Sequence, residues 1–248
     1  MKRRSRAHSC LTALGAAACA VSSPGLLSSQ TISLIAGANM TVLANVDQNH
    51  ERYDGFDPSY GANLGVGASF RLSPPEADES LWAQFSAVYA RKGAVMRPNS
   101  ALDEYEGLDF RLDYMELALL ADMRFHSIVD GIFIHFLVGP SLGVLLSCEV
   151  VEPSGDDEPP HLTGCLGDVG EEGSPWGFRR LDAGVVGGAG LEVALTERVG
   201  LHASAQRTFG LGYADTEYDA GTVDGPVLVP ALKNRALSLR AALAVPLG

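Results

Sequence analysis

The stretch Tyr60-Gly-Ala-Asn-Leu-Gly-Val-Gly-Ala-Ser-Phe-Arg-Leu72 alternates between two kinds of residue along its whole length. Its even positions are all apolar: Tyr60, Ala62, Leu64, Val66, Ala68, Phe70 and Leu72. Its odd positions hold glycine, Asn63, Ser69 and Arg71. Successive side chains of a β-strand point to opposite faces, so this period of two predicts a strand with one apolar and one polar face. Strands of soluble proteins average about five or six residues, whereas a tilted membrane-spanning strand needs about 9–11.

The same alternation returns in seven further segments, which makes eight expected strands. These segments are 31–42, 81–94, 110–125, 132–147, 181–195, 199–213 and 235–247. The connections alternate between short ones (73–80, 126–131 and 196–198) and long ones (43–59, 96–109, 148–180 and 214–234). All long loops of an up-and-down meander then emerge at one end. The pattern predicts an all-β fold for residues 31–248, an eight-stranded antiparallel up-and-down transmembrane β-barrel.

Composition narrows the class of protein. Of 248 residues, 46% are hydrophobic and only 19% are charged, which excludes wholesale disorder. The net charge of −12 makes nucleic acid an improbable partner. The four long loops contain 20 of the 30 acidic residues and only five basic ones, so we expect an acidic crown at one end of the barrel.

Residues 1–30 have the layout of a secretory signal peptide. Lys2, Arg3, Arg4 and Arg6 precede a short apolar stretch from Leu11 to Val21, and small residues follow it. We expect cleavage between about residue 20 and Gln30 and export to the outer membrane. Cys19 could alternatively accept a lipid, but the residues before it lack the leucine that such sites favour.

Five short segments in order and spacing resemble the PorT-like outer-membrane β-barrel domain, a family common in Bacteroidetes and related Gram-negative bacteria. They are Val88-Tyr-Ala-Arg-Lys-Gly93, Leu112-Asp-Tyr-Met-Glu-Leu-Ala-Leu-Leu-Ala121, Gly139-Pro-Ser-Leu-Gly143, Asp182-Ala-Gly-Val-Val-Gly-Gly-Ala-Gly-Leu-Glu192 and Phe209-Gly-Leu211. The resemblance implies an eight-stranded outer-membrane barrel, usually without an assigned activity. Ala118 departs from the proline usual in the family's fourth strand, and the chain ends Pro246-Leu-Gly248 rather than on an aromatic residue.

The polar strand faces predict a charged lumen. Its expected members are four cations and four anions: Arg71, Lys92, Arg124, Arg240, Glu116, Asp122, Asp182 and Glu192. An eight-stranded barrel is just wide enough to be filled by side chains, so we expect a salt-bridged plug rather than a diffusion pore. The alternative is a narrow polar path or ligand site.

Two cysteines remain after the signal peptide, Cys148 and Cys165, both in one long loop. In an oxidising compartment they can form a disulfide that contributes about 3 kcal/mol. Metal ligation by these cysteines is disfavoured, because neither a CxxC spacing nor a histidine pair accompanies them. The acidic runs 156–158 and 171–172 could bind calcium weakly, but solvated charge is the favoured interpretation.

No catalytic arrangement is evident from spacing. The mature histidines are His50, His126, His135, His161 and His202; only His202, two residues before Ser204 on a polar face, suggests a pair. The glycine-rich segment 184–190 does not match a dinucleotide motif.

We therefore expect a non-enzymatic barrel without a cofactor or a metal, with a structural or recognition role. Its expected partners are outer-membrane lipid, the insertion machinery and an unknown extracellular or periplasmic partner. The alternatives are a lipid-modifying outer-membrane enzyme, or a secreted soluble barrel whose apolar faces point inward to hold an apolar ligand.

Overall fold

The structure is a computed structural model that describes residues 30–46, 52–53, 56–74, 79–96, 107–129, 131–152, 161–166, 178–196, 198–212 and 232–247. Nearly all of the expected signal peptide and both acidic runs, 156–158 and 171–172, lie outside these residues. The described part of the chain contains no helix long and apolar enough to cross a membrane.

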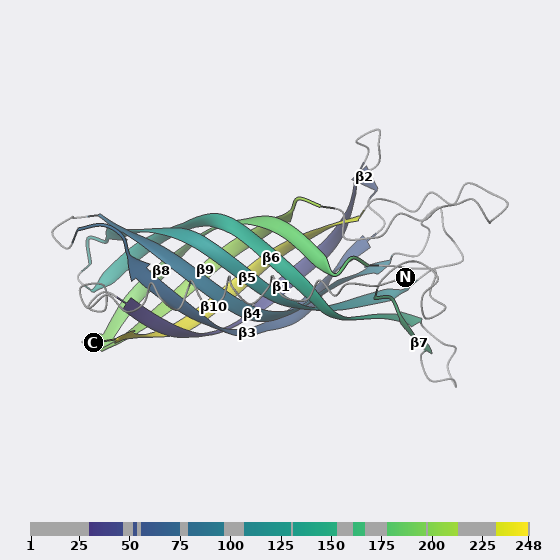
Figure 1. Ribbon diagram of the computed structural model, residues 1–248, viewed down its shortest axis with the longest axis horizontal. Coiled ribbons are helices and arrows are strands. Elements are labelled where there is room, and N and C mark those ends of the chain that lie inside the picture. Colours follow the sequence, from purple (N-terminus) through teal and green to yellow (C-terminus); the bar gives the residue numbers. More distant parts are fainter. Residues whose placement is uncertain are drawn as a thin grey trace, which may run out of the picture.

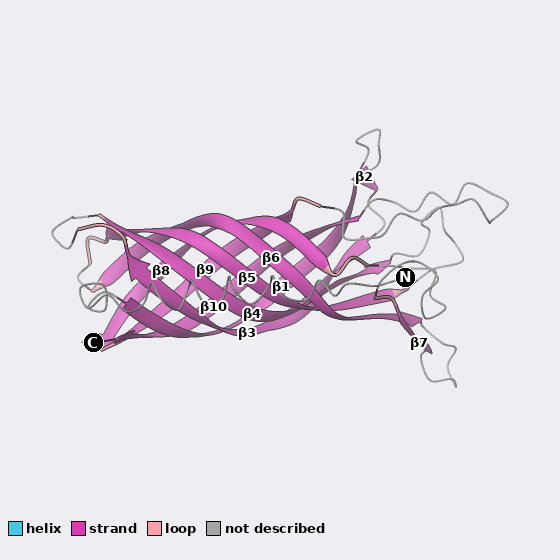
Figure 2. Ribbon diagram, viewed as in Figure 1, coloured by secondary structure: helices cyan, strands magenta, loops and turns pink. Residues whose placement is uncertain are grey.

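Ten strands form one sheet that closes on itself (Figures 1 and 2). They are β1 (Gln30–Val46), β2 (Arg52–Tyr53), β3 (Phe56–Arg71), β4 (Ser80–Met96), β5 (Asp109–His126), β6 (Ile132–Glu152), β7 (His161–Gly164), β8 (Leu181–Thr196), β9 (Val199–Gly210) and β10 (Leu232–Leu247). β2 and β7 are short additions to β1 and β6. The other eight strands pair antiparallel with their neighbours in chain order, and β1 pairs with β10 from Gln30↔Leu247 to Asn45↔Leu232. The predicted eight-stranded antiparallel barrel is confirmed.

The barrel has two unlike ends. The turn end holds the connections 72–79, 127–131 and 197–198 together with Gln30 and Leu247. The loop end holds the strand ends that the long connections join, together with β2 and β7, which lie at the side opposite the C-terminus in Figure 1. The eight barrel strands run from 12 residues in β9 to 21 in β6, so β6 is longer than its predicted segment.

The apolar strand faces point away from the barrel axis. In β3, Tyr60 and Leu64 are 76% and 67% exposed, whereas Asn63 and Ser69 are buried. Leu34, Leu119 and the outward positions of the remaining strands repeat this arrangement. A soluble barrel with an apolar calyx requires the opposite orientation, so that alternative is wrong.

The interior at the loop end is apolar, which the sequence analysis did not predict. The buried cluster contains Leu43, Phe56, Ala94, Met96, Leu108, Phe110, Leu112, Tyr114, Leu145, Cys148, Val150, Cys165 and Phe178. At its centre, the Phe110 ring packs against Phe56 and Phe178 with centroids 6.1 and 5.9 Å apart. These aromatic contacts fill the barrel across several strands, and we call this cluster the apolar layer.

Two irregularities adjust the sheet near the loop end. The register between β5 and β6 shifts between Asp113 and Tyr114, after which Cys148 and Val150 face inward. A second shift lies between Pro58 and Asn63 of β3. Beside it the Thr41 hydroxyl accepts a hydrogen bond from Gly93 N–H and donates one to the Gly93 carbonyl, both at 2.9 Å. This side chain ties β1 to β4 across β3.

Candidate functional site in the barrel interior

β5 passes through every layer of the interior. From the turn end to the loop end, its inward side chains include Arg124, Asp122, Glu116, Tyr114 and Phe110. The spacing of two places charged groups near the turn end and in the middle of the lumen, with the apolar Leu120 and Ala118 between them, and further apolar groups toward the loop end. Apart from the pair Arg124–Asp122 within β5, the partners of the charged groups come from other strands.

The central cluster is built around Glu116. Its Oε1 lies 2.6 Å from Nζ of Lys92 on β4, and its Oε2 lies 3.2 Å from a guanidinium nitrogen of Arg240 on β10. Arg240 also donates to the side-chain oxygen of Gln206 on β9 at 3.0 Å. Each of the three charged side chains is at most 10% exposed. Such a buried triad is stable only because every charge faces an opposite charge.

Asp182 has a neutral partner instead of an ion pair. The amide of Asn234 donates to Asp182 Oδ2 at 2.8 Å and to the Tyr114 hydroxyl at 3.1 Å. The Lys92 ammonium group lies 4.9 Å from the centre of the Tyr114 ring, on the side of the central cluster. Asp182, Asn234 and Tyr114 together connect the charged middle of the lumen to the apolar layer.

A second charged cluster, the turn-side cluster, lies nearer the turn end. Arg124 donates to Asp122 Oδ2 at 2.8 Å and to Glu192 Oε2 at 3.0 Å. His135 Nδ1 lies 3.0 Å from Asp122 Oδ1, and its Nε2 lies 3.1 Å from Glu192 Oε2. His202 Nε2 lies 3.4 Å from Glu192 Oε1. The side chains come from β5, β6, β8 and β9, and every contact except the one between Arg124 and Asp122 joins two different strands.

Arg71 is placed apart from both clusters, at the mouth of the lumen. It donates to Ser73 Oγ at 3.4 Å and to the Pro74 carbonyl at 3.0 Å. With Trp82, Arg124 and Glu192 it lines a cavity of about 480 Å³ that opens at the turn end. The eight expected lumen residues therefore divide into a mouth, a turn-side cluster, a central cluster and the amide-bonded Asp182.

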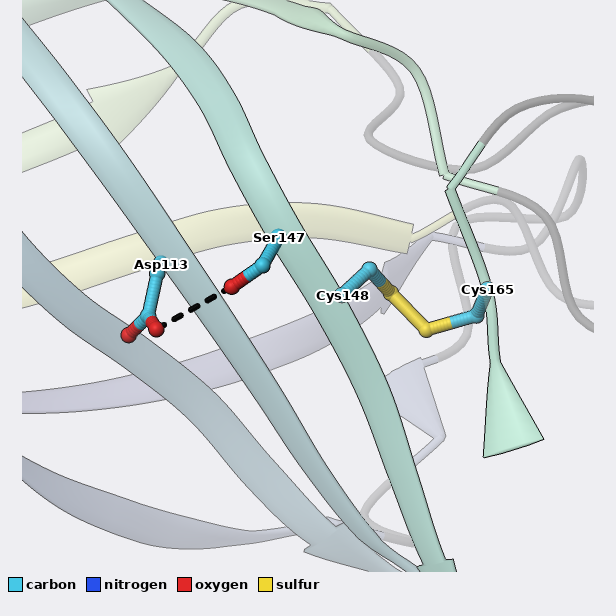
Figure 3. The surroundings of a disulfide bond; sticks show 4 residues. All are labelled: Asp113, Ser147, Cys148 and Cys165. Atoms are coloured by element: carbon cyan, nitrogen blue, oxygen red, sulfur yellow. Dashed lines mark hydrogen bonds between the residues drawn. A yellow bond between two sulfur atoms is a disulfide. The ribbon is translucent and has the colours of Figure 1, made fainter. Parts of the chain in front are cut away.

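Cys148 and Cys165 are joined by a disulfide bond within the apolar layer (Figure 3). Cys148 belongs to β6 and Cys165 directly follows β7, so the bond reinforces the pairing of these two strands. The backbone N–H of Cys165 also donates to the Cys148 carbonyl at 3.3 Å. Both cysteines are nearly fully buried.

The structure separates the suspected histidine–serine pair. His202 faces Glu192, whereas Ser204 Oγ accepts a hydrogen bond from Gln206 at 3.2 Å. No hydrogen bond joins His202 to Ser204 in the described residues. The sequence analysis named His135 but did not assign it to the lumen, although its odd position on β6 marks it as inward. Its contacts with Asp122 and Glu192 depend on strand pairings that residue spacing cannot show.

Residues 28–214 match the family described as outer membrane protein beta-barrel domain. The chain belongs to this family. The match is broader than the PorT-like resemblance, which stays a prediction. It agrees with the outward apolar faces and places the barrel in the outer membrane. No curated protein matches the chain significantly.

Solved outer-membrane barrels have a similar fold at low sequence identity. Neisserial surface protein A is 15% identical with a TM-score of 0.45, and the match covers 88% of this chain and 96% of that protein. OprG from Pseudomonas aeruginosa is 10% identical with a TM-score of 0.44, covering 89% and 96%. The outer-membrane enzyme PagL is 12% identical with a TM-score of 0.34, covering 86% and 97%.

Proposed function

We propose that this protein is a closed, non-catalytic outer-membrane barrel that has a structural or recognition role. The observation that carries the proposal is the filled interior, in which the central cluster lies below an apolar layer. An eight-stranded barrel has little interior space beyond its side chains, and the buried apolar layer and central cluster support a lumen without a diffusion pathway. The PorT-like resemblance and the predicted signal peptide support the same assignment.

The orientation of the barrel in the outer membrane follows from the difference between its turn end and its loop end. Bacterial outer-membrane barrels have short periplasmic turns and longer extracellular loops. The turn end, with both barrel termini, then faces the periplasm, and the long connections face the outside. Since those loops carry 20 acidic and five basic residues, they favour a partner with a cationic surface.

Fractionation and heat treatment test the membrane assignment. We expect the protein in the outer-membrane fraction, and we expect its band on a detergent gel to shift between unboiled and boiled samples. The purified barrel should give no steady conductance in planar lipid bilayers. Stable single-channel steps would contradict the closed barrel, and a water-soluble protein without a band shift would contradict the membrane assignment.

A lipid-turnover assay addresses the enzymatic alternative. We expect no release of acyl chains from lipopolysaccharide or phospholipid incubated with the folded barrel. Turnover that disappears on the substitution His202→Ala would contradict a non-catalytic role.

A further inference from the structure

We propose that His135, Glu192 and His202 form a binding site for one divalent transition-metal ion, with Zn²⁺ the best match. Each residue offers one ligand atom, and these three atoms all lie within 4.8 Å of one another. The site goes beyond the proposed structural or recognition role and does not depend on it.

The tautomer of His135 is the first argument. Asp122 accepts only, so the 3.0 Å contact to its carboxylate requires a proton on His135 Nδ1. A neutral His135 then has a lone pair on Nε2, which points at Glu192 Oε2 from 3.1 Å. Two acceptors facing each other in a buried site need either a second proton on the imidazole or a metal cation between or beside them. A metal ion coordinated by Nε2 and Glu192 supplies that cation.

His202 Nε2 also faces a carboxylate oxygen of Glu192 without a hydrogen bond. Its Nε2 is shielded from solvent and forms no hydrogen bond, although Glu192 Oε1 lies 3.4 Å away. The rings of His135 and His202 lie side by side, with centroids 5.1 Å apart. Glu192 therefore presents one oxygen toward each imidazole nitrogen.

The charge of the turn-side cluster also favours a bound cation. Among the described members of the turn-side cluster, the two carboxylates of Asp122 and Glu192 form ion pairs with the guanidinium of Arg124, so these side chains sum to one negative charge when both imidazoles are neutral. Buried charge is tolerated only when it is compensated. Because Arg124 donates to Oε2 of Glu192, Oε1 is the oxygen left for the ion.

The ligand set and its spacing fit zinc. Catalytic and other open zinc sites use three protein ligands, with His₂Glu among the known sets, and keep a fourth position for water. Metal–ligand bonds of about 2.0–2.1 Å in a tetrahedral site separate neighbouring ligand atoms by roughly 3.3 Å. The distance of 3.4 Å from Glu192 Oε1 to His202 Nε2 is close to this value, and all three ligand atoms lie within 4.8 Å of one another.

The residues behind the ligands hold them in place. A histidine that binds a metal usually donates its other ring nitrogen to a carboxylate, as His135 does to Asp122. Arg124 links Asp122 to Glu192, and its guanidinium lies 4.1 Å from the centre of the Trp82 ring. These contacts fix His135 and Glu192 before an ion arrives.

An entry path exists at the turn end. Glu192 lines the mouth cavity of about 480 Å³, and the side chains of Glu192 and His202 keep 18% and 21% of their surface exposed. On the other side, His135 and His202 border an inner cavity of about 40 Å³, enough for a water-sized ligand. The ion would therefore enter from the mouth and not through the apolar layer.

Metal titration of the folded barrel tests the proposal. The mature chain, without a polyhistidine tag, is titrated with Zn²⁺ by calorimetry and with Co²⁺ by visible absorption, both in excess Ca²⁺ to occupy acidic loops. We expect one ion per chain and Co²⁺ absorption bands characteristic of imidazole ligands. The substitutions His202→Ala and Glu192→Gln should each weaken binding more than about 100-fold, and Asp122→Asn about 10–100-fold.

His126→Ala is the matched control, because His126 lines the mouth cavity but lies outside the three-ligand group. It should leave stoichiometry and affinity unchanged, and the gel shift on boiling identifies variants that fold. If His202→Ala does not fold, His202→Gln keeps the side-chain volume. Absence of one-to-one binding to the folded native barrel would overturn the proposal, as would binding that survives both His202→Gln and Glu192→Gln.

Discussion

At the scale of single residues, Glu116 decides the stability of the lumen. Its carboxylate forms an ion pair with both Lys92 and Arg240, and all three side chains are buried. The substitution Glu116→Gln leaves two buried cations facing each other without an anion. We expect the free energy of unfolding to fall by about 3–5 kcal/mol, measured by urea titration of the barrel in lipid vesicles.

The ion pair between Arg91 and Asp113 is the control for this prediction. Its nitrogen–oxygen distance of 2.9 Å resembles that of the buried ion pairs, but the Arg91 side chain is 54% exposed. Solvent screens this pair, so Arg91→Gln should change the stability by at most about 1 kcal/mol. Equal effects of Glu116→Gln and Arg91→Gln would show that Glu116 does not hold the central cluster together.

At the scale of elements, the disulfide between Cys148 and Cys165 fixes β7 against the end of β6. The bond closes a loop with a sequence separation of 17, which restricts the unfolded chain. The double substitution Cys148→Ser and Cys165→Ser should therefore lower the unfolding free energy by about 3 kcal/mol. Denaturant unfolding of the mature protein with and without reductant measures the same difference.

Thiol counting provides the independent check on this bond. The mature protein, denatured without reductant, should expose no reactive thiol, and it should expose two after reduction. Two thiols before reduction would mean that the bond is absent, whatever the stability of the double variant.

The strands themselves were predictable because a period of two is local information. In β5, the outward Met115, Leu117 and Leu119 alternate with Glu116, and the inward parity of Asp122 and Arg124 followed from that pattern. The same parity also places Phe110 and Tyr114 inward. The apolar layer was nevertheless missed, because the alternation inverts near the loop end: Phe110, Leu112 and Tyr114 are the inward residues there, while polar residues alternate with them on the outer face.

Partners across the barrel could not be predicted, because they depend on register. Glu116 and Arg240 are 124 residues apart, and His135 and Glu192 are 57 apart. The shift between Asp113 and Tyr114 adds a residue to β6 and brings Cys148 to the inward side. A shift of one residue reverses the face of every later side chain, and spacing alone does not reveal where it occurs.

At the scale of the whole molecule, the inside and the outside of the barrel have opposite chemistry at mid-height. The lumen there contains Lys92, Glu116 and Arg240, while the outer face contains Leu34, Leu64 and Leu239. In water this arrangement would expose the apolar groups and bury the charged ones, each at a cost. In a lipid bilayer the acyl chains cover the apolar outer face, while the charged groups of the lumen compensate one another, so the membrane is part of what stabilises the fold.

Placement in the bilayer predicts a dependence on depth for one substitution at two positions. Leu239 on β10 and Leu211 just beyond β9 are both 61% exposed, but Leu239 lies midway along its strand and Leu211 lies at the loop end. Arginine at the bilayer midplane costs about 2–4 kcal/mol, and near the interface about 0–1. We therefore expect Leu239→Arg to destabilise the barrel folded in lipid vesicles by about 1–4 kcal/mol more than Leu211→Arg does. Denaturant titration in vesicles measures the destabilisation caused by each substitution. Equal values would contradict a membrane-spanning position for β10, because two equally exposed leucines on a water-exposed surface should respond alike.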